Sequence, residues 1–153
     1  MSNQFKTQRR VYFDTNVFVS CFRNQQHDVD AIKFLFGLRD TELYTSALSI
    51  SQTISTLQGK RKSLEYRQQI IDFINRILRK VNVTSVAETD IKSALAMPNI
   101  DIEDNIQYNI GCKSYCNVFV TNNVSDFNYV DVRVFNPKKI RQITQKHFVI
   151  KKK

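Results

Sequence analysis

Three acid-bearing segments, far apart along the chain, each lie beside strand-like residues. Asp14 directly follows the run Val11–Phe13, Asp104 belongs to an Asp-Ile-Glu-Asp segment, and Asp126 comes soon after the apolar run Val118–Val120. In open α/β folds, ligands bind at the carboxyl edge of the sheet, where the ends of sequence-distant strands are neighbours in space. We therefore expect these three carboxylates to lie close together.

Carboxylates that gather at one edge repel one another unless a cation holds them. Hard cations such as Mg²⁺ or Mn²⁺ take oxygen ligands and keep waters, one of which can become a nucleophile. The sequence therefore predicts a divalent-cation site in which Asp14, Asp104 and Asp126 are both the ligands and the catalytic acids. Glu103, beside Asp104, is a further candidate ligand, and its role stays open.

Local capping offers an alternative explanation for each acid. Asp14, Thr15 and Asn16 are all good N-cap residues for a helix. Asp101 stands where a helix begins and is assigned mainly to capping. Asp126 fits an Asx-type turn. Capping accounts for single acids, but it does not explain why three acidic segments occur beside strand ends.

Composition limits the class of protein. The 153 residues are enough for one domain with a proper core, and we treat 1–153 as a single domain. The hydrophobic content of 42% and the charged content of 24% are ordinary for a globular protein. The sequence contains neither a G-x-G-x-x-G motif nor a P-loop, so a dinucleotide-binding or P-loop enzyme is not expected.

The formal net charge of +9 favours a polyanionic partner, and nucleic acid is the commonest one. Basic residues gather on the predicted helix 62–80 and in a tail at about 146–153 that contains Lys146 and Lys151–Lys153. Charged helix faces are often only solvated, so that alternative stays open for each residue. The candidate RNA-binding residues are Arg61, Lys62, Arg67, Arg76 and Arg79.

Targeting and redox signals indicate the cytoplasm. Residues 1–10 are polar and basic without an apolar core, so they do not form a signal peptide. The chain has no apolar stretch of about 18 residues, so no membrane span is expected. Three cysteines form no disulfide framework, which fits a reducing compartment.

Strand-like and helix-like segments alternate along the chain. The expected strands are 11–13, 42–45, 81–86, 118–120 and 130–135. The expected helices are 28–38, 47–57, 62–80, 89–97, 101–115 and a last one that Pro137 opens. Strands separated by helices of this length form right-handed crossovers and a parallel sheet. The fold class is therefore α/β, a three-layer α/β/α sandwich with a parallel central sheet.

The order of the motifs resembles the PIN-domain family. The segments Asp14-Thr-Asn-Val, Ile102–Gln107 and Val120–Phe127 occur in that order in a chain of this length. Ser46-Ala-Leu-Ser-Ile-Ser after the second strand and Phe135-Asn-Pro before the last helix extend the likeness over nearly the whole chain. The sequence is most similar to the toxin-type (VapC-like) PIN ribonucleases of bacterial toxin–antitoxin modules.

This resemblance implies a quartet of acids that binds Mg²⁺ or Mn²⁺ and cleaves RNA. Asp14 would match the first acid of the family, Asp104 the third, and Asn123 with Asp126 the final polar-acid motif. Family members usually form homodimers, and an antitoxin protein neutralises them. The supporting polar residues would be Asn16, Ser46, Gln52, Thr121 and Asn123.

One position departs from the family pattern. Gln52 stands where the family commonly has a glutamate, and an amide brings no charge to the cation. The first hypothesis is a metal-dependent endoribonuclease, the toxin of a toxin–antitoxin pair. The alternative is a catalytically weakened PIN-like module that binds RNA or protein. A phosphate-binding signalling domain of flavodoxin-like topology is a third reading, and the missing phosphate loop after the first strand counts against it.

Overall fold

A computed structural model describes residues 9–129 and 131–143 of the chain. The predicted basic tail at about 146–153 lies outside these residues. Five strands form one sheet in the order β3-β2-β1-β4-β5, and every neighbouring pair is parallel. The strands are β1 (Arg9–Phe13), β2 (Thr41–Ser46), β3 (Val81–Thr84), β4 (Val118–Val120) and β5 (Arg133–Phe135).

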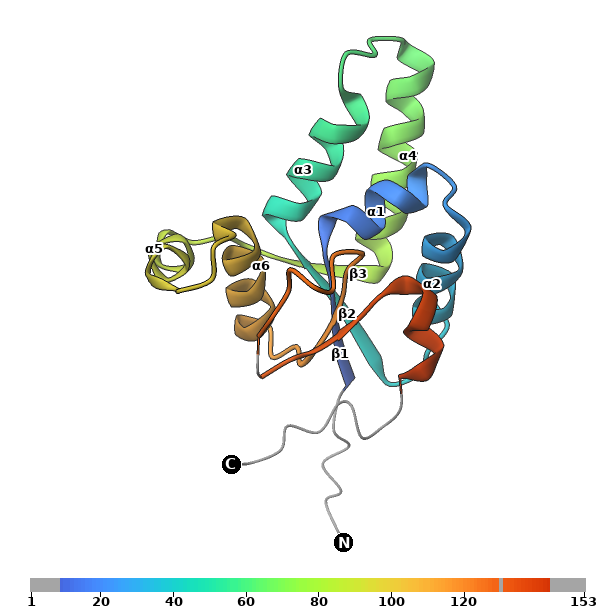
Figure 1. Cartoon of the computed structure of the whole chain (residues 1–153). Helices are drawn as coiled ribbons and strands as arrows, with labels where there is room; N and C mark the ends of the chain where they lie inside the picture. Colours follow the sequence, from blue (N-terminus) through green and yellow to red (C-terminus); the bar gives the residue numbers. More distant parts are fainter. Residues whose placement is uncertain (1–8, 130, 144–153) are drawn as a thin grey trace, which may run out of the picture.

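Helices cover both faces of this sheet. They are α1 (Thr15–Phe22), α2 (Gln26–Phe36), α3 (Ala47–Gln58), α4 (Leu64–Lys80), α5 (Glu88–Ala96), α6 (Ile102–Lys113) and the 3₁₀ helix η1 (Pro137–Gln142). Figure 1 shows α5 and α6 on one side of the strands, and α1, α2 and η1 on the other. The expected three-layer architecture with a parallel central sheet is therefore confirmed.

Side chains alternate between the two layers along the central strand. Val11 and Phe13 of β1 belong to a core that includes Leu35 of α2, whereas Tyr12 between them packs with Ile110 of α6. All five side chains are almost completely buried. This alternation follows from the two-residue period of a strand, and it shows why the central strand must be apolar on both faces.

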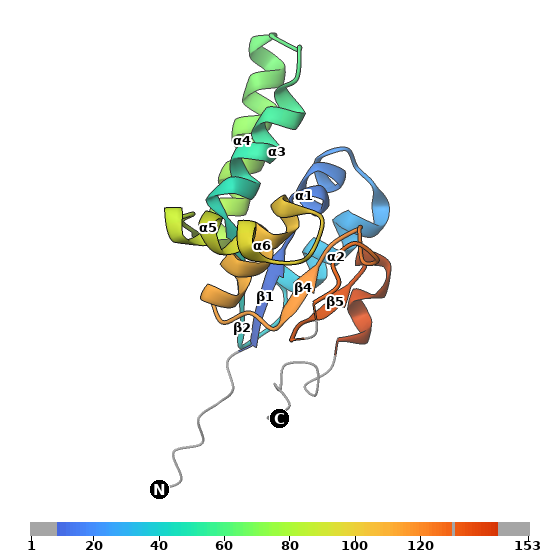
Figure 2. The same ribbon diagram turned by 60° about the vertical axis from the view of Figure 1, so that its left-hand side comes forward.

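Helices α3 and α4 form a hairpin that extends beyond the sheet, and Figure 2 shows it rising from the rest of the molecule. Ile70, Ile74 and Ile77 of α4 are buried, while the opposite face of the helix carries charged residues. The hairpin therefore depends on one apolar stripe of α4. No helix in the described part of the chain has both the length and the apolar character needed to span a membrane.

The structure corrects four details of the predicted elements. Helix α1 was not predicted as an element, because it has only eight residues, fewer than a helical period needs in order to show in the sequence. The third strand ends at Thr84 rather than Val86, and the fifth begins at Arg133 rather than at 130, a residue outside the described ranges. The last helix is 3₁₀ and begins at Pro137.

Gly111 of α6 allows the helix to approach the sheet closely. A Cβ atom at this position would lie 2.1 Å from Cζ of the buried Phe119 ring. We expect Gly111→Ala to lower the free energy of unfolding by about 1–3 kcal/mol, because a rigid ring in the core must move. Urea denaturation measures this. Gly37→Ala is the control, because its Cβ would meet only ordinary contacts at 3.6 Å. Equal effects in the two variants would contradict the packing argument.

Candidate metal and nucleic-acid site

Asp14 lies at the carboxyl end of the central strand. Its amide donates to the Val120 carbonyl at 3.0 Å, which continues the β1–β4 pairing. One carboxylate oxygen accepts from the Thr15 amide at 2.7 Å, and the other accepts from the Thr121 hydroxyl at 2.8 Å and the Asn16 amide at 3.1 Å. Asp14 is therefore the N-cap of α1, as the capping alternative predicted, and neutral donors hold its carboxylate.

A second set of polar groups fixes those donors in turn. The side-chain oxygen Oδ1 of Asn16 accepts from the Asn122 backbone amide at 3.0 Å, and the Thr121 hydroxyl accepts from the Asn123 backbone amide at 3.1 Å. The Asn122 side chain also donates to the buried carboxylate of Asp28 at 2.8 Å. Sequence reasoning missed Asn122 and Asp28. Asn122 belongs to the recognised segment Val120–Phe127, but no role was assigned to it. Asp28 stood at the start of a predicted helix, where an acid is common, so nothing in the sequence pointed to the site.

The N-terminus of α6 supplies three more acids. Asp101 is the N-cap and accepts from the Asp104 amide at 3.0 Å, so its predicted capping role is confirmed. Glu103 and Asp104 occupy the first turn, where the helix dipole favours negative charge. Asp104 is half-buried, whereas Asp101 and Glu103 are exposed.

These acids and Asp126 line one pocket of about 460 Å³. It draws its walls from the end of β1, from α1 and α3, from the start of α6 and from the loop after β4. The lining residues are Asp14, Thr15, Asn16, Val19, Ser20, Arg23, Thr56, Asp101, Glu103, Asp104, Asn123 and Asp126. The topology thus brings together the acids from all three sequence segments, and Asn123 with them. Ser20, Arg23 and Thr56 were not predicted.

The carboxylates raise one another's proton affinity. Burial raises the pKa of Asp14, its hydrogen bonds act in the opposite direction, and the charges of Glu103 and Asp101 raise it further. For Asp104, burial together with the charges of Asp101, Asp14, Asp126 and Glu103 raises the pKa to about 7. Burial is the larger cause of both shifts, and the neighbouring negative charges add to it. Among the described residues, none of these acids forms an ion pair with a lysine or arginine.

The donor set fits a hard divalent cation. The pocket offers carboxylate oxygens and the amide oxygen of Asn123, which are the ligands that Mg²⁺ and Mn²⁺ prefer. Within the described ranges, no three acidic, histidine or cysteine side chains stand close enough together to enclose a bare ion. Mg²⁺ keeps several of its own waters, so a partly hydrated ion suits a pocket of this size.

Gln52 lies beside the pocket rather than in its wall. Its side-chain oxygen accepts from the Thr15 hydroxyl at 2.9 Å, and Thr15 is the residue that lines the pocket next to Asp14. The Ser49 hydroxyl lies 3.0 Å from the same Thr15 oxygen. Gln52 therefore acts on the site through Thr15. The expected supporting role of Ser46 is also indirect, because its hydroxyl caps α3 and its side chain is fully buried.

Beneath this layer lies a buried cluster of hydroxyls around Gln107. The Gln107 side-chain oxygen accepts from the hydroxyls of Tyr12, Ser46 and Ser49. Its amide nitrogen has no hydrogen-bond partner in the described part of the chain. The cluster joins β1, the β2–α3 junction and α6, so it fixes the relative position of the elements that carry the acids. Sequence reasoning missed it because Tyr12 and Gln107 are 95 positions apart.

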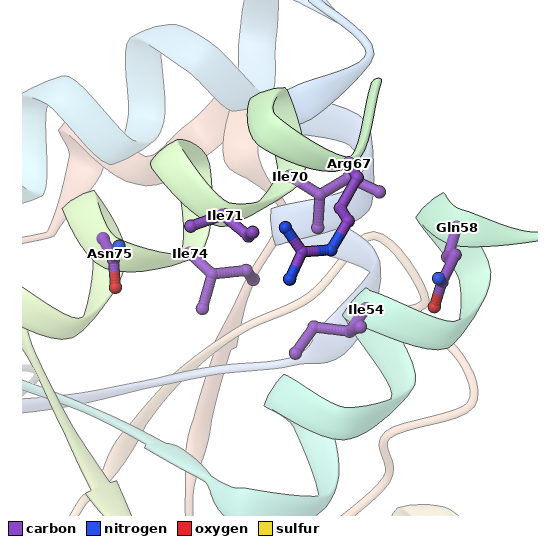
Figure 3. A pocket seen from close by; sticks show the side chains of 7 residues that line it. All are labelled: Ile54, Gln58, Arg67, Ile70, Ile71, Ile74 and Asn75. Atoms are coloured by element: carbon purple, nitrogen blue, oxygen red, sulfur yellow. The ribbon is translucent and has the colours of Figure 1, made fainter. Parts of the chain in front are cut away.

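The predicted RNA-binding arginines are spread over different surfaces. Arg67 lines an apolar pocket between α3 and α4, and Figure 3 shows its guanidinium between Ile54 and Ile74. Arg76 lines another pocket, between α1, α2 and α4. Arg61 alone among the five candidates lines a pocket that adjoins the acidic one. Lys62 and Arg79 are exposed.

A family model for the PIN domain matches residues 11–133, which is most of the chain. The chain belongs to the PIN-domain family. No match was found among curated proteins. The resemblance inferred from the three motifs is confirmed.

Solved PIN-domain toxins have a similar fold. FitAcB from Neisseria gonorrhoeae matches with a TM-score of 0.65 and 17% identity, over 83% of this chain and 97% of that one. VapBC-1 from nontypeable Haemophilus influenzae matches with a TM-score of 0.61 and 19% identity, over 85% and 99%. VapC20 from Mycobacterium tuberculosis, a toxin that cleaves the sarcin–ricin loop, matches with a TM-score of 0.59 and 15% identity, over 80% and 98%. At these identities the likeness is one of fold.

Asp104 should limit the stability of the cation-free protein. A carboxyl group whose pKa rises on folding binds protons more tightly when folded, so stability falls as pH rises from about 4 to about 7. Asp104→Asn removes this effect, so in EDTA it should raise the melting temperature at about pH 8 and change it little at about pH 4. Asp30→Asn, at an exposed position of α2, is the control. A variant no more stable than the wild type at the higher pH would contradict the raised pKa of Asp104.

Proposed function

We propose that this PIN-domain protein is an Mg²⁺- or Mn²⁺-dependent endoribonuclease and the toxin of a toxin–antitoxin pair. The observation that carries the proposal is the pocket in which acids from three distant segments meet without a paired lysine or arginine among the described residues. Family membership supports it, because PIN domains are typically metal-dependent ribonucleases.

Three carboxylates would hold a partly hydrated ion in this proposal, in part through the waters that the ion keeps. Asp14 and Asp104 approach from β1 and α6, Asp126 comes from the loop after β4, and Glu103 extends the negative field. When bound, a divalent cation supplies a Lewis acid that lowers the pKa of a water and offsets charge on the phosphate that is attacked. Asn123 offers the pocket a neutral oxygen.

The chain's own groups orient this site. The Thr121 hydroxyl and the Asn16 amide hold one oxygen of Asp14, which leaves the carboxylate a single orientation toward the pocket. The Arg23 side chain lines the same pocket and brings a positive charge to the phosphodiester. Electrostatic stabilisation by groups already in place is a large part of such catalysis.

An antitoxin protein, RNA and a second copy of the chain are the partners that we propose. The similar structures include a toxin–antitoxin complex from Klebsiella pneumoniae and DNA-bound VapBC from Salmonella typhimurium. Those assemblies support the antitoxin partner here. The basic excess of the chain, with a net charge of +9, supports RNA as the substrate.

Gln52 supports the alternative function, a catalytically weakened module that binds RNA or protein. The side chain that stands at the usual position of an acid is neutral and donates no charge to the ion. Less negative charge means weaker attraction for a divalent cation. Under this alternative the pocket would bind RNA but cleave it slowly or not at all.

Asp14→Asn tests the proposal. The amide keeps the size of the side chain, so we expect the fold to survive while Mn²⁺ binding and Mn²⁺-dependent cleavage of a single-stranded RNA fall at least tenfold. Isothermal titration calorimetry and a gel cleavage assay measure the two effects. The control is Asp72→Asn, at an exposed position of α4. Unchanged Mn²⁺ affinity in Asp14→Asn would show that the carboxylate is not a ligand.

Gln52→Glu separates the two functions. A carboxylate beside Thr15 lies near Asp14, so it should tighten Mn²⁺ binding and lower the melting temperature of the cation-free protein through added repulsion. If low occupancy by the ion limits the wild type, RNA cleavage should also increase. Calorimetry, thermal denaturation in EDTA and the cleavage assay distinguish these results. Tighter binding without any cleavage would favour the binding module.

A further inference from the structure

A second pocket, of about 450 Å³, opens beside the acidic one. It lies between the end of α1 and the tip of the α3–α4 hairpin. Arg23 and Thr56 line both pockets, so the two adjoin along α1, and we call the adjoining pair the depression. Helix α1 has eight residues and is therefore about 12 Å long, which sets the scale of the separation between the two ends.

The charges at the two ends are opposite. Arg23, Lys60 and Arg61 line the second pocket, and no carboxylate is among its lining residues. The first pocket is lined by carboxylates, with Arg23 at the shared wall. The depression therefore places a site suited to a cation next to a site suited to an anion.

Packing holds the basic pocket in shape. The Tyr66 hydroxyl donates to the Leu57 carbonyl at 2.7 Å, and the Tyr66 ring meets Phe22 edge-on with 6.0 Å between ring centroids. The Arg61 guanidinium lies over the same ring, 4.9 Å from its centroid. Gly59 makes the turn with a φ of +46°, a conformation that favours glycine. The tip of the hairpin thus presents Arg61 on an ordered aromatic support.

We propose that this basic pocket binds a phosphate of single-stranded RNA that flanks the phosphodiester held at the acidic end. The Lys60 ammonium would contact this phosphate, and Arg61 would contact it while stacked on Tyr66. Arg23, which lines both pockets, would lie between this phosphate and the phosphodiester at the acidic end. The inference rests on the proposed ribonuclease function, because that function puts a phosphodiester beside the acids. It also gives the path of the RNA strand on the protein, which runs along α1 toward the hairpin tip.

A polyanion with regularly spaced phosphates explains both ends of the depression. Acids alone repel RNA, and a divalent ion offsets that repulsion at only one phosphate. A second, cationic contact on the same strand supplies affinity where the ion does not reach. An acidic peptide would match the basic end but would be repelled at the other, so RNA is the better occupant.

The test compares two pairs of adjacent cations in the full chain. Lys60→Ala/Arg61→Ala removes two charges from the pocket, and Lys138→Ala/Lys139→Ala removes two exposed charges from η1. Binding of a fluorescent single-stranded oligoribonucleotide is measured by anisotropy across a salt series, in EDTA so that no cleavage occurs. Each lost phosphate contact should flatten the slope of log K against log salt by about 0.7.

For Lys60→Ala/Arg61→Ala we expect a flatter slope and weaker binding of RNA of any sequence. For Lys138→Ala/Lys139→Ala we expect nearly wild-type values. Lys60→Arg/Arg61→Lys, which keeps both charges, should restore the wild-type slope. Equal losses in the two alanine pairs would overturn the inference, because net charge alone would then explain them. The inference would also be overturned if Lys60→Ala/Arg61→Ala weakened the binding of a polyglutamate peptide but not that of RNA, because the pocket would then bind an acidic peptide.

The ribonuclease proposal is checked separately with Mn²⁺ and the same oligonucleotide. If Lys60→Ala/Arg61→Ala has a flatter slope than the wild type but the wild type cleaves no RNA, the RNA pocket stands and the nuclease proposal is refuted. If the wild type cleaves the RNA but Lys60→Ala/Arg61→Ala has the wild-type slope, the nuclease proposal stands and the pocket is refuted.

Discussion

Repulsion among carboxylates is the constraint on which the site depends. Neutral donors hold Asp14, and no described lysine or arginine pairs with the acids around it. Burial and the charges of the neighbouring acids together raise the pKa of Asp104 to about 7. The strand ends and the start of α6 must therefore be rigid enough to hold like charges together, and the buried cores on both faces of the sheet supply that rigidity.

The polar cluster around Gln107 adds to this rigidity in a way that apolar packing cannot. Hydroxyls on β1, on the β2–α3 junction and on α3 all donate to one side-chain oxygen on α6. Hydrogen bonds are directional, so the cluster sets the register between α6, which carries Asp104, and β1, which carries Asp14. A chain of hydroxyls then reaches Thr15 through Ser49, which links the buried cluster to the edge of the pocket.

The sequence predicted the fold well where local patterns decide it. The run Val118–Val120 was recognised because an unbroken apolar triplet suits a strand buried on both faces, and the N-cap at Asp101 followed from residue chemistry. Helix α1 was missed because it has only eight residues, too few for a helical period to show in the sequence. The shared pocket wall at Arg23 and Thr56 was also beyond prediction, since it depends on how α1 packs against α3.

The neutral Gln52 and the basic tip of the α3–α4 hairpin together determine how strongly the surface attracts a cation and an anionic substrate. Without a carboxylate at Gln52, the acids repel one another less when no ion is bound, but they also attract an ion less strongly. Affinity for an anionic substrate must then come from elsewhere on the surface. Lys60 and Arg61 lie at the far end of the depression, where they can attract phosphates without neutralising the acids. We infer that separation of the two charges along α1 lets one surface hold both a cation and a polyanion. If Lys60 and Arg61 were paired with the acids instead, the acids would attract a cation less strongly and the two basic residues would attract a phosphate less strongly.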